Sequence, residues 1–388
     1  MKDVFEFYMP THVLMGYGQL SNLHQQTLPG KKALIVTSNG KSTKVNGYLA
    51  DVEHELDQAG VQHILFDHVR PNPTNHNVMD GAKLAHEQDC DFVVALGGGS
   101  VMDCGKFIAL MMTNSGDIMD YSMSAQGGHQ TPQHPAAPIV AITTSAGTGS
   151  EVDNGGVVSD DESQEKTAIG FPSLFPTIAV VDARLMMSVP KNYTVYQGMD
   201  TFLQAAESMV NTQNNPMGEM FALKVIELVA KYLPRAYRNG QDREARENMA
   251  LANTLGGYYM YCTSEHTMEH TMGSFHPDLV HGAGLIMICR SYFKFFADRK
   301  AAEEPMMKMA KAMGVEHPTS GQNFIKALDD LLKSLDADNL KMSDAGITKE
   351  ELKKYPAKIH EVIGGDIHAD PLPLSDEDYL AIYEDAYK

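Results

Sequence analysis

The sequence is poor in cysteine and lacks any long apolar run. Its four cysteines, Cys90, Cys104, Cys262 and Cys289, lie far apart and form no CxxC or CxxH pair. The N-terminal residues MKDVFEFYMP lack the apolar core of a signal peptide, and no apolar run approaches the roughly 20 residues that span a bilayer. We therefore expect reduced thiols, a cytoplasmic location and no membrane partner.

Basic residues are scarce relative to acidic ones. Lys and Arg number 31 against 50 Asp and Glu, which gives a formal net charge of −19 at pH 7. A chain this acidic repels phosphate backbones, so we expect no nucleic-acid partner, and any phosphate-bearing ligand needs local groups to hold it. The 388 residues exceed what one hydrophobic core usually holds, which predicts two domains.

The first half alternates short apolar runs with helical stretches. Strands are predicted at residues 33–37, 63–66, 91–96, 139–144 and 177–182, with helices at 45–58 and 78–88. Strands that alternate with helices indicate a largely parallel sheet covered on both faces. Residues 1–187 are therefore predicted to form an α/β, Rossmann-like nucleotide-binding domain.

Helical patterns dominate after Pro190. They cover residues 198–211, 217–232, 242–263, 304–313 and 320–335, and no convincing strand pattern follows. Residues 188–388 are therefore predicted to form an all-helical domain.

A glycine-rich turn follows the strand predicted at 91–96. Gly97, Gly98, Gly99 and Ser100 lie between that strand and a helix, where backbone N–H groups and the helix N-terminus favour an anion. Asp103 is expected in the first turn of this helix, within reach of cofactor hydroxyls. The alternative interpretation is a tight strand-to-helix turn without a ligand.

A second loop, residues 143–151, is rich in hydroxyls and glycines and also follows a predicted strand. Thr143, Thr144 and Thr148 are candidates for binding a diphosphate or ribose. The alternative is an ordinary Ser/Thr-rich loop.

A histidine cluster and a carboxylate indicate a divalent metal. Asp200 and Gln204 are four residues apart, as are His266 and His270, so each pair shares one helix face. Two further histidines, His276 and His281, follow within the same short stretch. Paired histidines with a carboxylate are a common recipe for a metal site, although such pairs also occur on helix surfaces.

Together these segments resemble the iron-containing (group III) alcohol dehydrogenase family over nearly the whole chain. The resemblance rests on the loops 97–106 and 143–151, Asp182, the segment 198–200, the segment 266–282 and the motif 370–374. It implies a dehydroquinate synthase-like architecture with a nucleotide-binding domain and a helical metal- and substrate-binding domain. It also implies that Asp200, His266 and His281 bind Fe²⁺, or Zn²⁺ or Ni²⁺, and that His270 transfers a proton.

Gln204 departs from the family pattern, which has a second histidine ligand at this position. An amide oxygen is a neutral and harder donor than imidazole, so softer metals should bind less tightly. We favour a site that keeps its metal through Asp200, Gln204, His266 and His281 over one that is metal-poor.

A second departure concerns the cofactor. NAD-preferring members tend to carry an Asp where this chain has Ser38, followed by Asn39, Gly40 and Lys41. Losing that acid removes repulsion against a 2′-phosphate, and Lys41 and Lys44 add positive charge, so the pattern is compatible with NADP(H) as well as NAD(H). A solvated turn without cofactor contact is the alternative. Lys166 completes the expected cofactor-binding set.

The expected function is therefore an NAD(P)-dependent, metal-assisted oxidoreductase that interconverts a small alcohol and its aldehyde or ketone, working as a homodimer. Three alternatives keep the fold. One is a metal-independent reductase of an activated or acidic substrate, like the maleylacetate reductases. The others are a lyase like dehydroquinate synthase and a non-catalytic nucleotide-binding protein.

Overall fold

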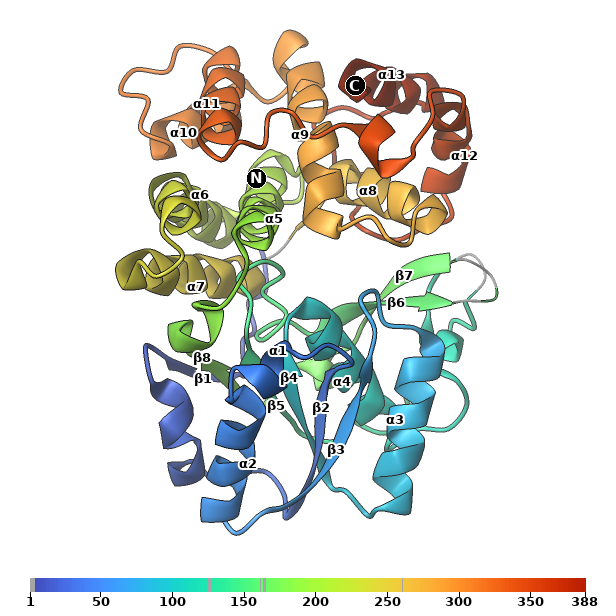
Figure 1. Ribbon diagram of the computed structural model, residues 1–388. Helices are drawn as coiled ribbons and strands as arrows, with labels where there is room; N and C mark the ends of the chain where they lie inside the picture. Colours follow the sequence, from blue (N-terminus) through green and yellow to red (C-terminus); the bar gives the residue numbers. More distant parts are fainter. Residues whose placement is uncertain (1–3, 125–126, 161, 163–164, 260) are drawn as a thin grey trace. The chain divides into compact units, whose positions relative to one another are not determined.

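The computed structural model describes residues 4–124, 127–160, 162, 165–259 and 261–388. The chain divides into two compact units (Figure 1). The α/β unit spans Tyr8–Ser188, and the helical unit comprises Val189–Lys388 and the described residues before Tyr8. No helix in the described ranges is both long and apolar enough to cross a membrane.

A six-stranded parallel sheet forms the α/β unit, as the alternating pattern predicts. In spatial order its strands are β1 (His12–Met15), β8 (Ile178–Val181), β5 (Ile139–Thr143), β4 (Phe92–Gly97), β2 (Lys32–Ser38) and β3 (Gln62–Val69). Every neighbouring pair is parallel. Because chain order reverses between β2 and β4, the carboxyl ends of these strands flank a topological switch point, the usual ligand-binding place in open α/β sheets.

Both faces of the sheet are buried, because successive side chains of a strand point to opposite faces. In β4, Phe92, Val94 and Leu96 join the core beneath η1 (Gln19–Gln25) and α2 (Tyr48–Gln58). Val93 and Ala95 join the other core, beneath α3 (Asn75–Glu87) and α4 (Gly99–Met111). Figure 1 shows α2 and α3 on opposite sides of the strands.

Three features of this unit differ from the sequence prediction. The edge strand β1 and an antiparallel ribbon of β6 (Gly155–Asp160) and β7 (Glu165–Gly170) were not predicted. The helix expected at 45–58 is two helices, α1 (Ser42–Val45) and α2, because Gly47 between them has φ of 78°. β6 begins with two glycines, which carry no strand signal in the sequence.

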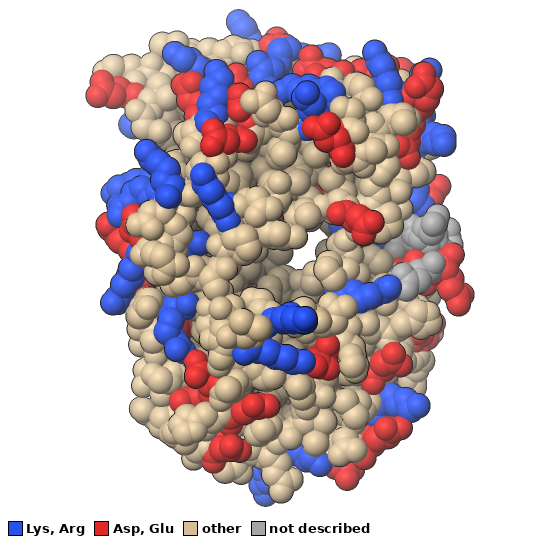
Figure 2. All heavy atoms as spheres, viewed as in Figure 1, with Lys and Arg blue, Asp and Glu red and all other residues tan. Residues whose placement is uncertain are grey.

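The helical unit contains no strand among its described residues. Its helices are α5 (Lys191–Val210), α6 (Pro216–Arg238), α7 (Arg243–Tyr258), α8 (Ser264–Phe275), α9 (His281–Asp298), α10 (Glu303–Ala312), α11 (Gln322–Ser334), α12 (Tyr355–Ile359) and α13 (Asp376–Ala386). The helix expected at 242–263 ends at Tyr258, and α8 begins separately. Acidic and basic side chains are interspersed on the viewed face of each unit (Figure 2).

Helix α5 lies at the centre of the helical unit, against α6, α7 and α9. Every residue from Gly198 to Val210 is buried. Such a helix would normally be apolar all round, yet Asp200, Gln204 and Glu207 follow one another on one face. Buried polar side chains need partners, so this face marks the position of a site.

Candidate functional site

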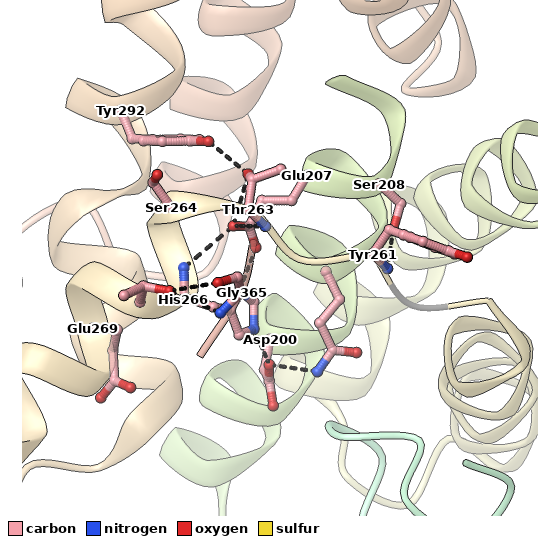
Figure 3. A network of polar contacts seen from close by, with 12 residues as sticks. Asp200, Glu207, Ser208, Tyr261, Thr263, Ser264, His266, Glu269, Tyr292 and Gly365 are labelled. Atoms are coloured by element: carbon pink, nitrogen blue, oxygen red, sulfur yellow. Dashed lines mark hydrogen bonds and ion pairs between the residues drawn. The ribbon is translucent and has the colours of Figure 1, made fainter. Parts of the chain in front are cut away.

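Helices α8 and α9 bring imidazole groups to the polar face of α5. His266 and His270 lie one turn apart on α8, and His281 opens α9. The Nε2 atoms of His266 and His281 lie 3.5 and 3.8 Å from the same oxygen, Oδ1 of Asp200. Ligand atoms of these three residues all lie within 4.8 Å of one another. The structure therefore brings together the three predicted metal ligands from separate helices, and Figure 3 shows Asp200 and His266 among them.

Buried carboxylates orient the two histidines. Nδ1 of His266 contacts Oε2 of Glu207, and Nδ1 of His281 contacts Oε2 of Glu269. A carboxylate accepts, so each Nδ1–H donates and each Nε2 faces Asp200. Carboxylate–histidine pairs of this kind are a regular feature of metal centres, where they fix the ring and strengthen it as a donor.

Gln204 is oriented toward the same oxygen. Its Nε2 donates to Oδ1 of Asp200 at 2.9 Å, while its buried Oε1 has no hydrogen-bond partner among the described residues. A half-turn of the amide would exchange the two atoms and place Oε1 beside Asp200. Two oxygens without a proton between them repel each other unless a cation is present, so Gln204 can serve as either a hydrogen-bond donor or a ligand.

His270 lies next to this group. Its Nδ1 donates to the carbonyl oxygen of Ile363 at 2.9 Å, which makes Nε2 the basic nitrogen. Its ring centroid lies 5.4 Å from that of His281. The predicted cluster is thus assembled except for His276, which instead pairs with Glu351 at 2.9 Å.

The helical unit buries several carboxyl groups around these histidines. Five carboxyl groups are at most 4% exposed, those of Asp200, Glu207, Glu265, Glu269 and Asp370. Burial raises the pKa of Glu265 well above its usual value, and neither of its oxygens has a hydrogen-bond partner within the described ranges. Burial lowers the pKa of His266, but Cys262, Glu207 and Asp200 outweigh it and raise the pKa overall. This group of buried acids favours a bound cation.

In the α/β unit, the two predicted nucleotide-binding loops lie together. β4 ends at Gly97 and α4 begins at Gly99, as predicted. A Cβ on Gly99 would lie 2.6 Å from Cγ2 of Thr148, and one on Gly98 would lie 3.1 Å from Oγ of Ser145. The absence of a Cβ at these two positions leaves room for this close approach. The amide of Thr144 donates to the Gly97 carbonyl at 2.9 Å, so both loops meet at one edge of the sheet.

Asp103 differs from its predicted place, because the first turn of α4 carries no acidic residue. Its carboxylate accepts from Oγ of Ser150 at 2.7 Å and from the amide of Val157 at 2.9 Å, and burial raises its pKa to about 6. The buried Lys106 donates to Ser150 and Asp153 at 2.8 and 2.6 Å. These two side chains hold the second loop against α4.

Residues after β2 are exposed at the same edge of the sheet. Asn39 donates its amide to the Val69 carbonyl at 2.9 Å, and Gly40 and Lys41 are exposed. Lys44 forms an ion pair with Asp67 and lowers the pKa of that acid, so its charge is already balanced. Lys41 is the cation of this turn that stays a candidate for a 2′-phosphate.

The structure also places Thr143 and Lys166, two other residues predicted to bind the cofactor. Oγ1 of Thr143 donates to the Ser145 carbonyl at 3.0 Å, within the second loop. Lys166 is buried on β7.

Glu207 and Glu269 are functional residues that the sequence pattern does not reveal. Glu207 lies seven residues after Asp200, on the same face of α5, and Glu269 lies three residues after His266. Helical spacing from the predicted ligands was the available signal. It was not decisive because a glutamate in a helix is usually exposed.

Taken separately, the two units define a class of protein. A parallel sheet with a glycine-rich turn at its switch point is typical of dinucleotide binding, and an Asp–His–His cluster is typical of a metal that acts on oxygen. The combination is that of a metal-assisted, nucleotide-dependent oxidoreductase.

Comparison with known families gives a specific assignment. Residues 10–183 match the family described as "Iron-containing alcohol dehydrogenase", and residues 194–387 match "Fe-containing alcohol dehydrogenase family, C-terminal". The chain therefore belongs to the iron-containing alcohol dehydrogenase family, and it is an NAD(P)-dependent enzyme that interconverts an alcohol and its aldehyde or ketone.

Individual relatives agree with this assignment. The chain is 37% identical over 322 residues to alcohol dehydrogenase 4 of Schizosaccharomyces pombe, covering 82% of this chain and 74% of that protein. It is 31% identical to the 1,3-propanediol dehydrogenase of Klebsiella pneumoniae, with 99% of each covered. An archaeal halo-thermophilic alcohol dehydrogenase from a Red Sea brine pool has a similar structure, with a TM-score of 0.93, 30% identity and 100% of each chain covered.

Proposed function

We propose that Asp200, Gln204, His266 and His281 hold one divalent cation, with Fe²⁺, Zn²⁺ and Ni²⁺ as candidates. One observation carries this proposal: both Nε2 atoms turn toward the same Asp200 oxygen, at 3.5 and 3.8 Å, while carboxylates occupy both Nδ1 atoms. These separations are longer than an ordinary hydrogen bond, so three potential ligand atoms converge on one point without being bonded to one another. The donor set of carboxylate, amide oxygen and two imidazoles suits a borderline metal.

We further propose that His270 exchanges the proton of the alcohol. A bound cation supplies Lewis-acid polarisation of the substrate oxygen, and NAD(P) supplies the hydride chemistry. The Ile363 carbonyl holds the Nδ1 proton of His270, so Nε2 accepts a proton during alcohol oxidation and returns it during aldehyde reduction.

The nucleotide is proposed to bind at the carboxyl edge of the sheet. The amides of Gly97, Gly98, Gly99 and Ser100 and the N-terminus of α4 would hold the diphosphate. Thr143, Thr144, Thr148 and Lys166 would add polar contacts, and Asp103 would act mainly by holding the second loop. Ser38, Asn39, Gly40 and Lys41 would meet the adenosine ribose, with NADP(H) preferred because no acid repels a 2′-phosphate.

We propose a small alcohol or its aldehyde as the substrate. Relatives named for propanediol, choline, methanol and butanol point to this size range. A homodimer in the cytoplasm is part of the same proposal.

A metal-independent reductase is the second candidate, and the hydrogen bond from Gln204 to Asp200 favours it, because it satisfies the acid without a cation. Stripping the protein with a chelator and then adding Fe²⁺, Zn²⁺ or Ni²⁺ separates the two candidates. We expect activity toward small aldehydes to disappear and return, faster with NADPH than with NADH. An Asp200→Ala variant should neither retain metal nor respond to it. Full activity in chelated, metal-free wild type would refute the metal proposal.

A further inference from the structure

A chain of buried oxygen atoms connects His266 to the segment that precedes α13. Oε1 of Glu207 accepts from Oγ1 of Thr263 at 3.1 Å, and that hydroxyl lies 2.6 Å from Oη of Tyr292. Oη of Tyr292 lies 2.5 Å from Oδ1 of Asp370. Figure 3 shows Tyr292, Thr263 and Glu207 in line with His266. This series of contacts thus connects His266 on α8, through residues of α5 and α9, to Asp370.

Asp370 also has a second set of partners. Its Oδ2 accepts from Oγ of Ser264, the first residue of α8, and that hydroxyl lies 3.0 Å from Oη of Tyr379. The segment before Asp370 is fastened to the same place, since the Asp366 amide donates to the Cys262 carbonyl at 3.0 Å. Asp370 therefore lies where the C-terminal segment meets the start of the helix that carries His266.

The hydroxyl groups supply too few protons for a hydrogen bond at every contact in this series of oxygen atoms. Five contacts join hydroxyl and carboxylate oxygens, but Thr263, Ser264, Tyr292 and Tyr379 supply only four hydroxyl protons. Glu207 already accepts Nδ1–H of His266 and the amides of Thr263 and His266, so both of its oxygens are occupied by donors.

Asp370 is the better place for a fifth proton. Burial raises the pKa of Asp370 to about 6, and it faces Glu207 on α5, Glu265 on α8 and the phenols of Tyr292 and Tyr379. The neighbouring acids oppose a further negative charge at this position.

We propose that Asp370 is a positioning residue for the metal site, which acts through Tyr292, Thr263 and Glu207 to orient the His266 imidazole. It touches neither the proposed cation nor the substrate. By fixing Tyr292 it fixes Thr263, and Thr263 in turn holds Glu207 in the position that receives Nδ1–H of His266. The inference rests on the metal site proposed above, which it extends from the ligands to the C-terminal segment.

Metal binding by the chelated, metal-free protein tests this inference without any assay of activity. The full chain is titrated with Co²⁺, and binding is followed by its visible absorption, whose shape reports ligand geometry. Tyr292→Phe and Asp370→Leu should bind Co²⁺ more weakly, by less than the roughly 10- to 100-fold cost of losing a direct partner of a metal ligand, because both residues act through Thr263 and Glu207. Asp370→Asn should bind nearly as tightly as wild type, because an amide offers both an acceptor and a donor and can satisfy all five contacts.

A matched control separates positioning from general destabilisation. Tyr355 is also fully buried, but its hydroxyl has no hydrogen-bond partner among the described residues, so Tyr355→Phe should leave Co²⁺ affinity and spectrum unchanged. The melting temperature of each metal-free variant shows whether it folds, and Tyr292→Phe carries the test if Asp370→Leu does not. Wild-type affinity in Tyr292→Phe would overturn this inference alone. Absence of Co²⁺ binding by wild type would overturn the metal site and this inference together.

Discussion

At the scale of single residues, we expect Gln204 to determine how strongly the proposed site holds a metal. Its amide lies 2.9 Å from Asp200, where its oxygen would be a neutral ligand. Gln204→His supplies an imidazole at this position, and we expect Zn²⁺ to bind on the order of tenfold more tightly because imidazole suits this metal better. Competition with a chromophoric chelator measures the change.

Gln204→Leu is the matching control, since it keeps the bulk of the side chain without a donor atom. It should weaken Zn²⁺ binding relative to wild type. Equal affinities of the Leu variant and wild type would show that Gln204 contributes no ligand.

The second residue-scale prediction concerns proton transfer by His270. His270→Gln should lower kcat by roughly 10²- to 10⁴-fold, the usual contribution of a general acid–base group. Metal content should stay unchanged, because Asp200, His266 and His281 keep their partners. The pH dependence of kcat should also lose the limb that the imidazole causes. His276→Gln is the control, since His276 pairs with Glu351 outside the cluster. A normal pH profile in His270→Gln would exclude the relay.

At the scale of elements, the strand–turn–helix of β4 and α4 depends on close approach by the second loop. A Cβ on Gly99 would lie 2.6 Å from Cγ2 of Thr148, so Gly99→Ala must displace the Thr148 side chain or the loop that carries it. Overpacking of this kind costs about 1–3 kcal/mol. We therefore expect NADPH to bind roughly 10- to 100-fold more weakly, as measured by nucleotide fluorescence.

A second substitution tests the cause of that loss. Thr148→Ser removes Cγ2, the atom that the new Cβ would meet, and should partly restore NADPH binding to Gly99→Ala. Independent, additive effects of the two substitutions would show that the contact is not the cause.

Elements buried on both faces could be predicted from the sequence, and those stabilised by local contacts could not. The central strands β2, β4 and β5 are continuous apolar runs, so their positions were predicted to within about two residues. The ribbon of β6 and β7 was missed because its pairing compensates for the glycines at Gly155 and Gly156.

In the site, the residues that could not be predicted depend on contacts between separate elements. The spacing of Asp200, His266 and His281 identified a cluster, but nothing in the sequence showed that Glu269 is buried. That burial depends on Gly284 of α9, where a Cβ would lie 2.9 Å from the Glu269 side chain. Contact between two helices decides whether this acid orients a histidine or faces water. Asp103 was misjudged for a similar reason, because its partners come from the loop at Ser150 and from β6.

At the scale of the whole molecule, the proposed cation should contribute to stability, because the chain has a net charge of −19 and the helical unit buries several acids. A ligand that binds only the folded state adds about 4 kcal/mol at a thousand times its dissociation constant. For a unit of this size that corresponds to a rise in melting temperature of about 10 °C. Calorimetry of wild type before and after chelation should show this loss. Asp200→Ala should show little difference between the two conditions, because it has no complete site to empty. If chelation leaves the wild-type transition in place, the buried acids are satisfied by protons instead of a metal ion.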